Sequence, residues 1–150
     1  MEPRVVYMRM KLLPVVALAA ASLAVSVSGC SSDPSFEDSL RDAASDSSFT
    51  LPSTTADGAS WSQLAVLCPY GAVPGSASES IREAAADVDT DADDGHQWLV
   101  FDTDDGAETV KLSRESWDFC NTDDEEPVYA PDQKWTASED SGVTVVRPVD

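Results

Sequence analysis

The sequence has little positive charge and a single histidine. Its 150 residues include 9 Lys or Arg against 28 Asp or Glu, a formal net charge of −19. Such a chain repels polyanions, so nucleic acid is not expected as a partner. With 42% hydrophobic residues and four Trp the chain is not disordered throughout, but its length allows only one modest core. One small domain is therefore expected.

The lone histidine, His96, limits the catalytic chemistry. It rules out a zinc site with several His ligands, and any Ser-His-Asp triad would depend on His96. The sequence also has no G-x-S-x-G element, no phosphate-binding glycine loop and no S-x-x-K element. We therefore predict that the protein is not an enzyme and uses no cofactor, and we interpret His96 as a loop residue at a strand edge.

The N-terminus has the pattern of an export signal. Residues 12–27 carry no charge and follow three basic residues. The run ends in Val27-Ser28-Gly29-Cys30, which closely resembles the lipobox of bacterial lipoprotein signal peptides. The resemblance implies removal of residues 1–29 and diacylation of Cys30. A transmembrane helix is the alternative, because residues 12–29 have the minimum length for a membrane span.

Lipidation of Cys30 predicts where the protein is located. Two acyl chains satisfy the requirement for stable anchoring, so we expect the extracytoplasmic face of the cell membrane. Without residues 1–29 the chain keeps 27 acidic and 6 basic residues, a net charge of −21. Anionic lipid would repel this surface, so the lipid at Cys30 is expected to do the anchoring while the domain faces outward.

Residues 30–60 are predicted to form a flexible tether. Residues 31–60 contain 12 Ser or Thr and 6 Asp or Glu with few large apolar side chains. This composition buries too little surface to order itself. Ser35, Phe36 and Leu40 have the spacing of a short capped helix inside the tether. That helix is expected either to lie on its own domain or to act as a partner-binding peptide.

Residues 61–150 have the pattern of a small folded domain. The apolar run over residues 61–68 predicts a buried strand, which Pro69 and Gly71 end. A capping box at Ser76 and Glu79 predicts a helix over residues 77–87.

More strands are predicted in the second half of the domain. Residues 97–102 and 108–112 are expected to form a hairpin with Asp105-Gly106 as its turn. Shorter strands are expected around residues 117–120, 134–137 and 143–146. The predicted fold class is α+β: a small antiparallel sheet with one main helix packed on it, after the disordered acidic tether.

Part of this domain resembles a small uncharacterised domain of bacterial lipoproteins. The resemblance rests on a Trp that opens the strand over residues 61–70, the helix that follows, the sequence Trp98-Leu99-Val100-Phe101, and Asp118-Phe119. It covers residues 61–120 loosely. The resemblance implies the same fold and implies no activity.

Two cysteines remain once Cys30 is lipidated. Cys68 and Cys120 are an even pair in an exported, oxidising setting, so we predict a disulfide between them. The alternatives are a redox-active pair, which normally has C-x-x-C spacing, and a metal site, which needs further His or Cys ligands.

The acidic residues gather in short clusters. Asp89, Asp91 and Asp93 alternate as at the start of a calcium loop, but the sixth position of that frame is Asp94, where Gly is required. We therefore predict a solvated acidic surface and no metal site. The four Trp lie in apolar strand segments, so most of them are expected in the core, although exposed rings would suit sugar binding.

These observations favour a non-catalytic binding or interaction module of the cell envelope. Its expected partners are the membrane, through Cys30, and an envelope protein or wall component. The alternative functions are an extracytoplasmic calcium-binding protein and a small hydrolase that uses paired carboxylates.

Overall fold

The computed structural model describes residues 34–122 and 125–150, except for the side chains of residues 34 and 35. Residues 1–33, with the predicted signal peptide and Cys30, lie outside the described residues. The elements in chain order are α1 (Pro34–Ala43), β1 (Trp61–Leu67), α2 (Glu79–Ala85), β2 (His96–Thr103), β3 (Gly106–Ser113), β4 (Trp117–Asp118), β5 (Val128–Tyr129), β6 (Trp135–Asp140) and β7 (Val143–Pro148).

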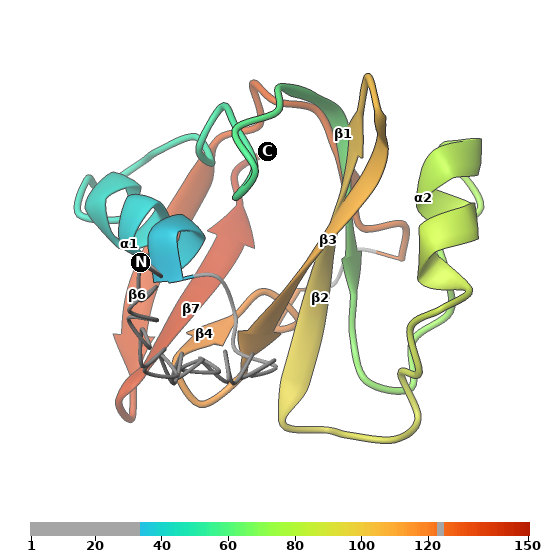
Figure 1. Cartoon of the computed structure of the whole chain (residues 1–150). Coiled ribbons are helices and arrows are strands. Elements are labelled where there is room, and N and C mark those ends of the chain that lie inside the picture. The colour runs from blue at the N-terminus through green and yellow to red at the C-terminus, as the bar shows by residue number, and fades with distance from the viewer. Residues whose placement is uncertain (1–33, 123–124) are drawn as a thin grey trace, which may run out of the picture.

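The strands form two sheets (Figure 1). The first sheet is antiparallel, with strand order β3-β2-β1-β5. The second has the order β4-β7-β6, with β4 parallel and β6 antiparallel to β7. The predicted α+β class is confirmed. The three strands predicted after residue 116 all belong to the second sheet, whereas the sequence had predicted a single sheet.

Strands β1 and β2 are buried on both faces, which explains their continuous apolar runs. Leu64 and Val66 face the larger core cluster, whereas the alternate residues Ala65 and Leu67 face a smaller cluster under α2. Side chains alternate between the two faces of a strand, so both faces of this sheet are covered. Figure 1 shows α2 on one side of the first sheet, and the second sheet with α1 on the other.

The four Trp are all buried, which confirms that they belong to the core. Their exposed fractions are 6% for Trp61, 8% for Trp98, 3% for Trp117 and 1% for Trp135. Aromatic rings pack edge to face around them, with ring centroids 5.3 Å apart for Trp61 and Phe101 and 4.6 Å apart for Tyr129 and Trp135. This geometry is the one that aromatic pairs prefer.

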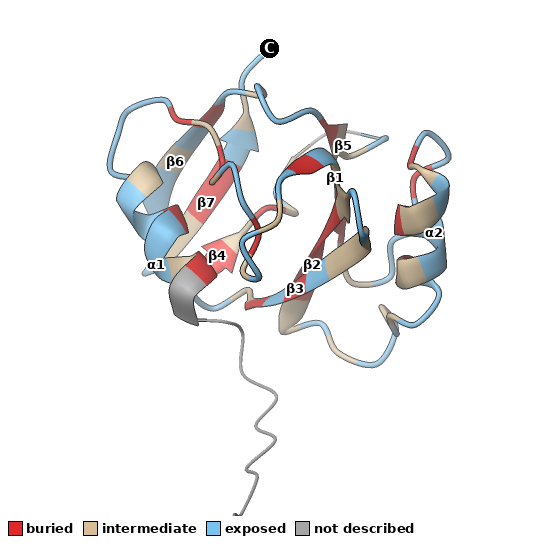
Figure 2. Ribbon diagram, turned by 45° about the horizontal axis from the view of Figure 1, so that its top comes forward, coloured by how far each residue is buried: buried red, intermediate tan, exposed pale blue. Residues whose placement is uncertain are grey.

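The predicted tether is wrong for its described part. Phe36 and Leu40 of α1 are buried in the larger core cluster, and so are Phe49 and Leu51 farther along. Figure 2 colours the buried parts of α1 and of the strands red. Phe49 also exchanges backbone hydrogen bonds with Trp135, at 2.9 and 2.8 Å. The prediction of a tether rested on the polar composition of the whole segment. It overlooked these four apolar side chains, whose spacing suits a helix followed by an extended chain. The short helix predicted here is confirmed, and it lies on its own domain.

Two local predictions are corrected by one or two residues. The N-cap of α2 is Ser78, whose hydroxyl accepts from the Ile81 N–H, and not the predicted Ser76. The β2–β3 turn consists of residues 104–105, because Thr103 pairs with Gly106. Gly106 then opens β3 with a φ of 123°, a conformation that favours glycine.

Candidate binding site

The chain leaves β1 through a strained turn. The Gly71 N–H donates to the Cys68 carbonyl at 2.9 Å, which places Pro69 and Tyr70 at the centre of the turn. Tyr70 has a φ of 59°, a left-handed conformation at a turn position that normally takes Gly or Asn. For a residue with a side chain this conformation costs about 1–2 kcal/mol. The turn therefore holds a tyrosine where glycine would avoid this strain.

The segment over residues 68–75, here called the Tyr70 loop, is also the most apolar exposed part of the described chain. Tyr70 is 68% exposed and Val73 is 38% exposed. Among the described residues only Val149 joins them as an exposed large hydrophobic side chain. Two of the three thus lie within four positions of each other on one loop.

A shallow groove of about 300 Å³ adjoins the Tyr70 loop. Its lining comes from the end of β1, the Tyr70 loop, Cys120 and the segment before β5. The lining residues are Val66, Cys68, Gly71, Ala72, Val73, Pro74, Cys120, Glu125, Glu126 and Pro127. Eight of these ten residues have uncharged, mostly apolar side chains, but polar atoms make up nearly as much of the exposed lining as apolar atoms do, and the Glu125 and Glu126 carboxylates lie in its wall.

Covalent and polar contacts hold the Tyr70 loop in place. Cys68 and Cys120 form the predicted disulfide, with their Cα atoms 5.7 Å apart. The Tyr70 N–H donates to the Thr90 carbonyl at 3.0 Å. Farther along, Ser76 donates to the Glu126 carboxylate through its N–H at 3.2 Å and its hydroxyl at 2.9 Å. These bonds, the backbone bond first, lower the pKa of Glu126 below its ordinary value.

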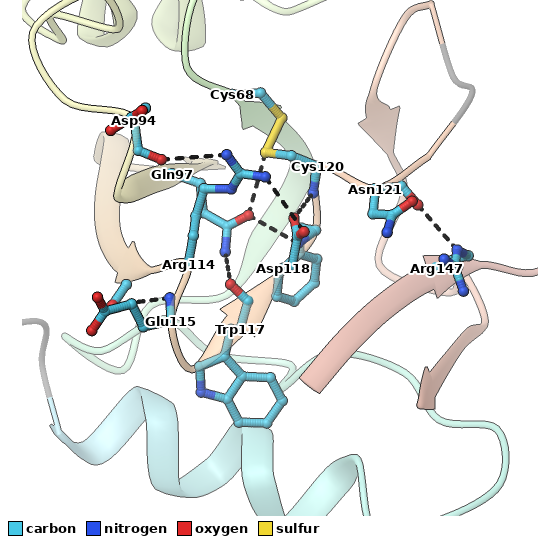
Figure 3. A network of polar contacts seen from close by, with 12 residues as sticks. Cys68, Asp94, Gln97, Arg114, Glu115, Trp117, Asp118, Cys120, Asn121 and Arg147 are labelled. Carbon is cyan, nitrogen blue, oxygen red and sulfur yellow. Dashed lines mark hydrogen bonds and ion pairs between the residues drawn. A yellow bond between two sulfur atoms is a disulfide. The ribbon is translucent and has the colours of Figure 1, made fainter. Parts of the chain in front are cut away.

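The other half of the disulfide is held by a buried glutamine (Figure 3). Gln97 is fully buried, its Nε2 donates to the Trp117 carbonyl at 2.6 Å, and its Oε1 accepts from the Phe119 N–H at 2.9 Å. One side chain thus replaces the backbone pairing that the chain lacks between β2 and residues 117–119. Gln97 was not among the residues expected from the sequence pattern to have a role. The available signal was a long polar side chain at the start of an otherwise apolar strand.

An arginine adds a second connection in the same region. The Arg114 guanidinium donates to the Asp94 carbonyl at 3.3 Å and lies 3.4 Å from the Asp118 carboxylate (Figure 3). Asp118 also accepts from the Cys120 N–H at 2.8 Å. The segment that carries Cys120 is therefore attached at the open end of the β2–β3 hairpin, where β2 begins and β3 ends.

The histidine has a structural environment. His96 opens β2, and its Nδ1 pairs with the Asp93 carboxylate. Asp93 also accepts from the Gly95 N–H at 2.8 Å and lies 3.6 Å from the Lys111 ammonium. The Gly95 bond, followed by the His96 bond, lowers the pKa of Asp93. His96 was predicted as a loop residue at a strand edge, and this is corrected: it is the first residue of β2 and pairs with Ser113 of β3.

A larger groove of about 630 Å³ lies between α2 and strands β2 and β3. Its floor includes Trp98, and the Lys111 ammonium lies 5.9 Å from the centre of that ring. Because Lys111 also reaches Asp93, this cation covers the ring and is partly neutralised.

The acidic cluster that begins at Asp89 is largely exposed, although Asp93 is half-buried. Asp89 and Asp91 are both exposed, and the Asp91 N–H donates to the Asp89 carboxylate at 3.1 Å. Within residues 34–122 and 125–150, no group of three or more His, Cys, Asp or Glu side chains is arranged to hold a metal ion.

Comparison with known proteins gives no match to a family model, to a curated protein or to a solved structure. The resemblance to a lipoprotein domain therefore stays a prediction. No helix in the described part of the chain is long and apolar enough to cross a membrane.

Proposed function

We propose that this protein is a lipid-anchored module of the cell envelope that binds a partner through the Tyr70 loop. The observation that carries the binding function is the strained and exposed Tyr70. Strained backbone persists where the surrounding structure enforces it, and it concentrates at functional sites. Exposed tyrosines are also frequent anchors of protein interfaces. The disulfide and Glu126 keep the loop ordered before a partner arrives, which lowers the entropy cost of binding.

The location in this proposal rests on the sequence around Cys30. The acidic domain suits a lipid anchor, because its charge opposes adhesion to anionic lipid through the protein surface. The test is a Cys30→Ala variant, with fractionation of the cells that make it. We expect the variant to leave the membrane fraction or to keep its uncleaved N-terminal segment. Membrane retention at the wild-type mature mass contradicts the lipid anchor.

The binding function is tested by photo-crosslinking in cells. A photoreactive phenylalanine analogue replaces Tyr70 in one variant and Thr136, an exposed residue on β6, in the other. We expect a discrete crosslinked product from position 70 and none of that mass from position 136. Equal products from both positions, or none from position 70, contradict binding through the Tyr70 loop. The result for Cys30→Ala is independent of this one, so anchor and binding are separable.

A further inference from the structure

The chemistry around the Tyr70 loop narrows the choice of partner. The Tyr70 N–H and the Gly71 carbonyl both bond to Thr90, at 3.0 and 3.4 Å. Thr90 lies in the sequence between the exposed acids Asp89 and Asp91. Carboxylates therefore flank the loop on the side of the segment that follows α2.

The groove beside the loop has the same sign of charge. Glu125 and Glu126 line it, and the described lining contains no Lys or Arg. Hydrogen bonds from Ser76 lower the pKa of Glu126, so this carboxylate stays ionised even in mildly acid solution. The loop that carries the exposed ring thus lies beside a groove with apolar side chains, and the charged groups lining that groove are carboxylates.

This combination argues against two of the available occupants. A second copy of the chain has the same large negative charge, and the copies would repel each other. An anionic membrane would be repelled for the same reason. A cationic partner gains from the rim, and an Arg or Lys side chain over an aromatic ring adds a cation–π attraction.

We propose that the Tyr70 loop binds a basic peptide segment of another protein. The segment places an apolar side chain in the groove beside Val73 and Pro74, and an Arg or Lys side chain over the Tyr70 ring. The groove of about 300 Å³ has the size for one or two apolar side chains. This inference rests on the proposed binding function and adds the chemistry of the partner.

The test measures binding of synthetic peptides to the full chain in detergent micelles by fluorescence anisotropy. Three matched sets are used as probes: peptides with Arg and Leu, peptides with Glu and Leu, and peptides with Arg and Ser. We expect binding of the Arg and Leu set alone, weakening as salt is added. Equal binding of the Glu and Leu set, or no binding of any set, overturns the proposal of a basic segment.

Variants of the loop separate the ring from the backbone. Tyr70→Gly removes the ring and relieves the positive φ, so it should fold at least as well as wild type yet raise the Kd about tenfold. Tyr70→Phe keeps the ring and should change the Kd by less than about twofold. An unchanged Kd for Tyr70→Gly overturns the role of the ring.

Two exposed valines supply a matched control. Val73 is 38% exposed in the loop, and Val149 is 40% exposed near the C-terminus. Val73→Ser should raise the Kd several-fold, whereas Val149→Ser should leave it unchanged. Equal effects of the two changes contradict docking in the groove.

Binding of a second copy of the chain or of an anionic membrane would give different experimental results. Sedimentation of the full chain that shows a dimer lost in Tyr70→Gly would replace the basic partner with a second copy. A polarity-sensitive dye at position 70 that shifts to the blue in phosphatidylglycerol vesicles would replace it with the membrane. A position-70 crosslink in cells without any preference for basic peptides would leave the binding function standing and this inference refuted.

Discussion

The interior of the domain and the Tyr70 loop differ in how well their side chains are packed and in how relaxed their backbone is. In the interior, both ends of the buried Gln97 amide are hydrogen-bonded, and the Phe119 and Trp135 rings meet edge to face at 5.6 Å. In the loop, Tyr70 combines a φ of 59° with 68% exposure. The interior residues are packed and hydrogen-bonded in ways that stabilise the fold, whereas the exposure and the backbone conformation of Tyr70 do not.

The turn between β6 and β7 also contains a residue with a positive φ, and it serves as a comparison for Tyr70. Ser141 has a φ of 53° and Gly142 has a φ of 91°, in the two-residue turn that joins β6 to β7. Two successive positive φ values are what a tight hairpin turn requires, so the strain at Ser141 serves the fold. Tyr70 lies in a turn that closes no hairpin. The turn itself requires the positive φ at this position, and what it does not explain is the presence of a tyrosine where glycine would avoid the strain.

The largest effect is expected from the interior at α1. Phe36→Ala removes a ring that is 2% exposed in the main core, so it should lower the free energy of unfolding by about 3–5 kcal/mol. Asp42→Ala, on the exposed side of the same helix, should change it by less than about 0.5 kcal/mol. Urea unfolding followed by Trp fluorescence measures both. If both variants are as stable as the wild type, α1 does not contribute to the core and the segment is a flexible tether.

The disulfide comes next, because it connects the interior to the loop. Cys68 and Cys120 are 52 positions apart, and closing a loop of this size stabilises a fold by about 4 kcal/mol in the chain-entropy model. The double variant Cys68→Ala and Cys120→Ala should lose about that amount in urea unfolding. Peptide mass mapping that finds two free thiols in the exported wild-type protein would contradict the pairing itself.

The buried glutamine should have a smaller effect of the same sign. Gln97→Leu leaves the Trp117 carbonyl and the Phe119 N–H without their partner, so the free energy of unfolding should fall by about 1–3 kcal/mol. Gln133→Leu, at a partly exposed glutamine, serves as the control and should cost less. A neutral Gln97→Leu would show that the interior tolerates unpaired polar groups here.

The loop should respond with the opposite sign. Tyr70→Gly should raise the free energy of unfolding by about 0.5–1 kcal/mol, because relief of the left-handed strain exceeds the added entropy of the unfolded chain. Ser141→Gly should have a similar effect on stability and none on binding. Thermal melting measures the effect. If Tyr70→Gly has a lower Tm than the wild type, the Tyr70 ring stabilises the fold and the loop does not differ from the interior in this respect.

The smallest effect concerns pH. The ordinary pKa values are 3.8 for Asp93 and 4.5 for Glu126, and folding lowers both. The unfolded chain therefore binds more protons in acid, and the stability from these groups is present at neutral pH and lost as the pH falls through the lowered values. Glu126→Gln should flatten the decline of Tm between about pH 5 and pH 3. If Tm falls with pH as steeply in Glu126→Gln as in the wild type, the Ser76 hydrogen bonds to Glu126 do not stabilise the folded protein.

Local patterns in the sequence predicted much of the first sheet. The apolar runs that begin at Trp61 and near Trp98 are strands, as expected, because strands buried on both faces need no alternation. The helix after the Tyr70 loop was expected over residues 77–87 and is shorter, Glu79–Ala85. Two serines compete as its cap, and Gln63 favours Ser78 by accepting from its N–H at 2.7 Å. A contact 15 residues away decides that boundary.

The sequence by itself determined the α+β class, the burial of the four Trp and the pairing of Cys68 with Cys120. Each of these depends on hydrophobic pattern or residue count, which need no knowledge of neighbours in space. Only the tertiary structure decided that α1 and Phe49 complete the core, that Gln97 holds the segment before Cys120, and that Tyr70 takes a positive φ. These features depend on contacts between distant parts of the chain, whose energies outweigh local composition and turn preference.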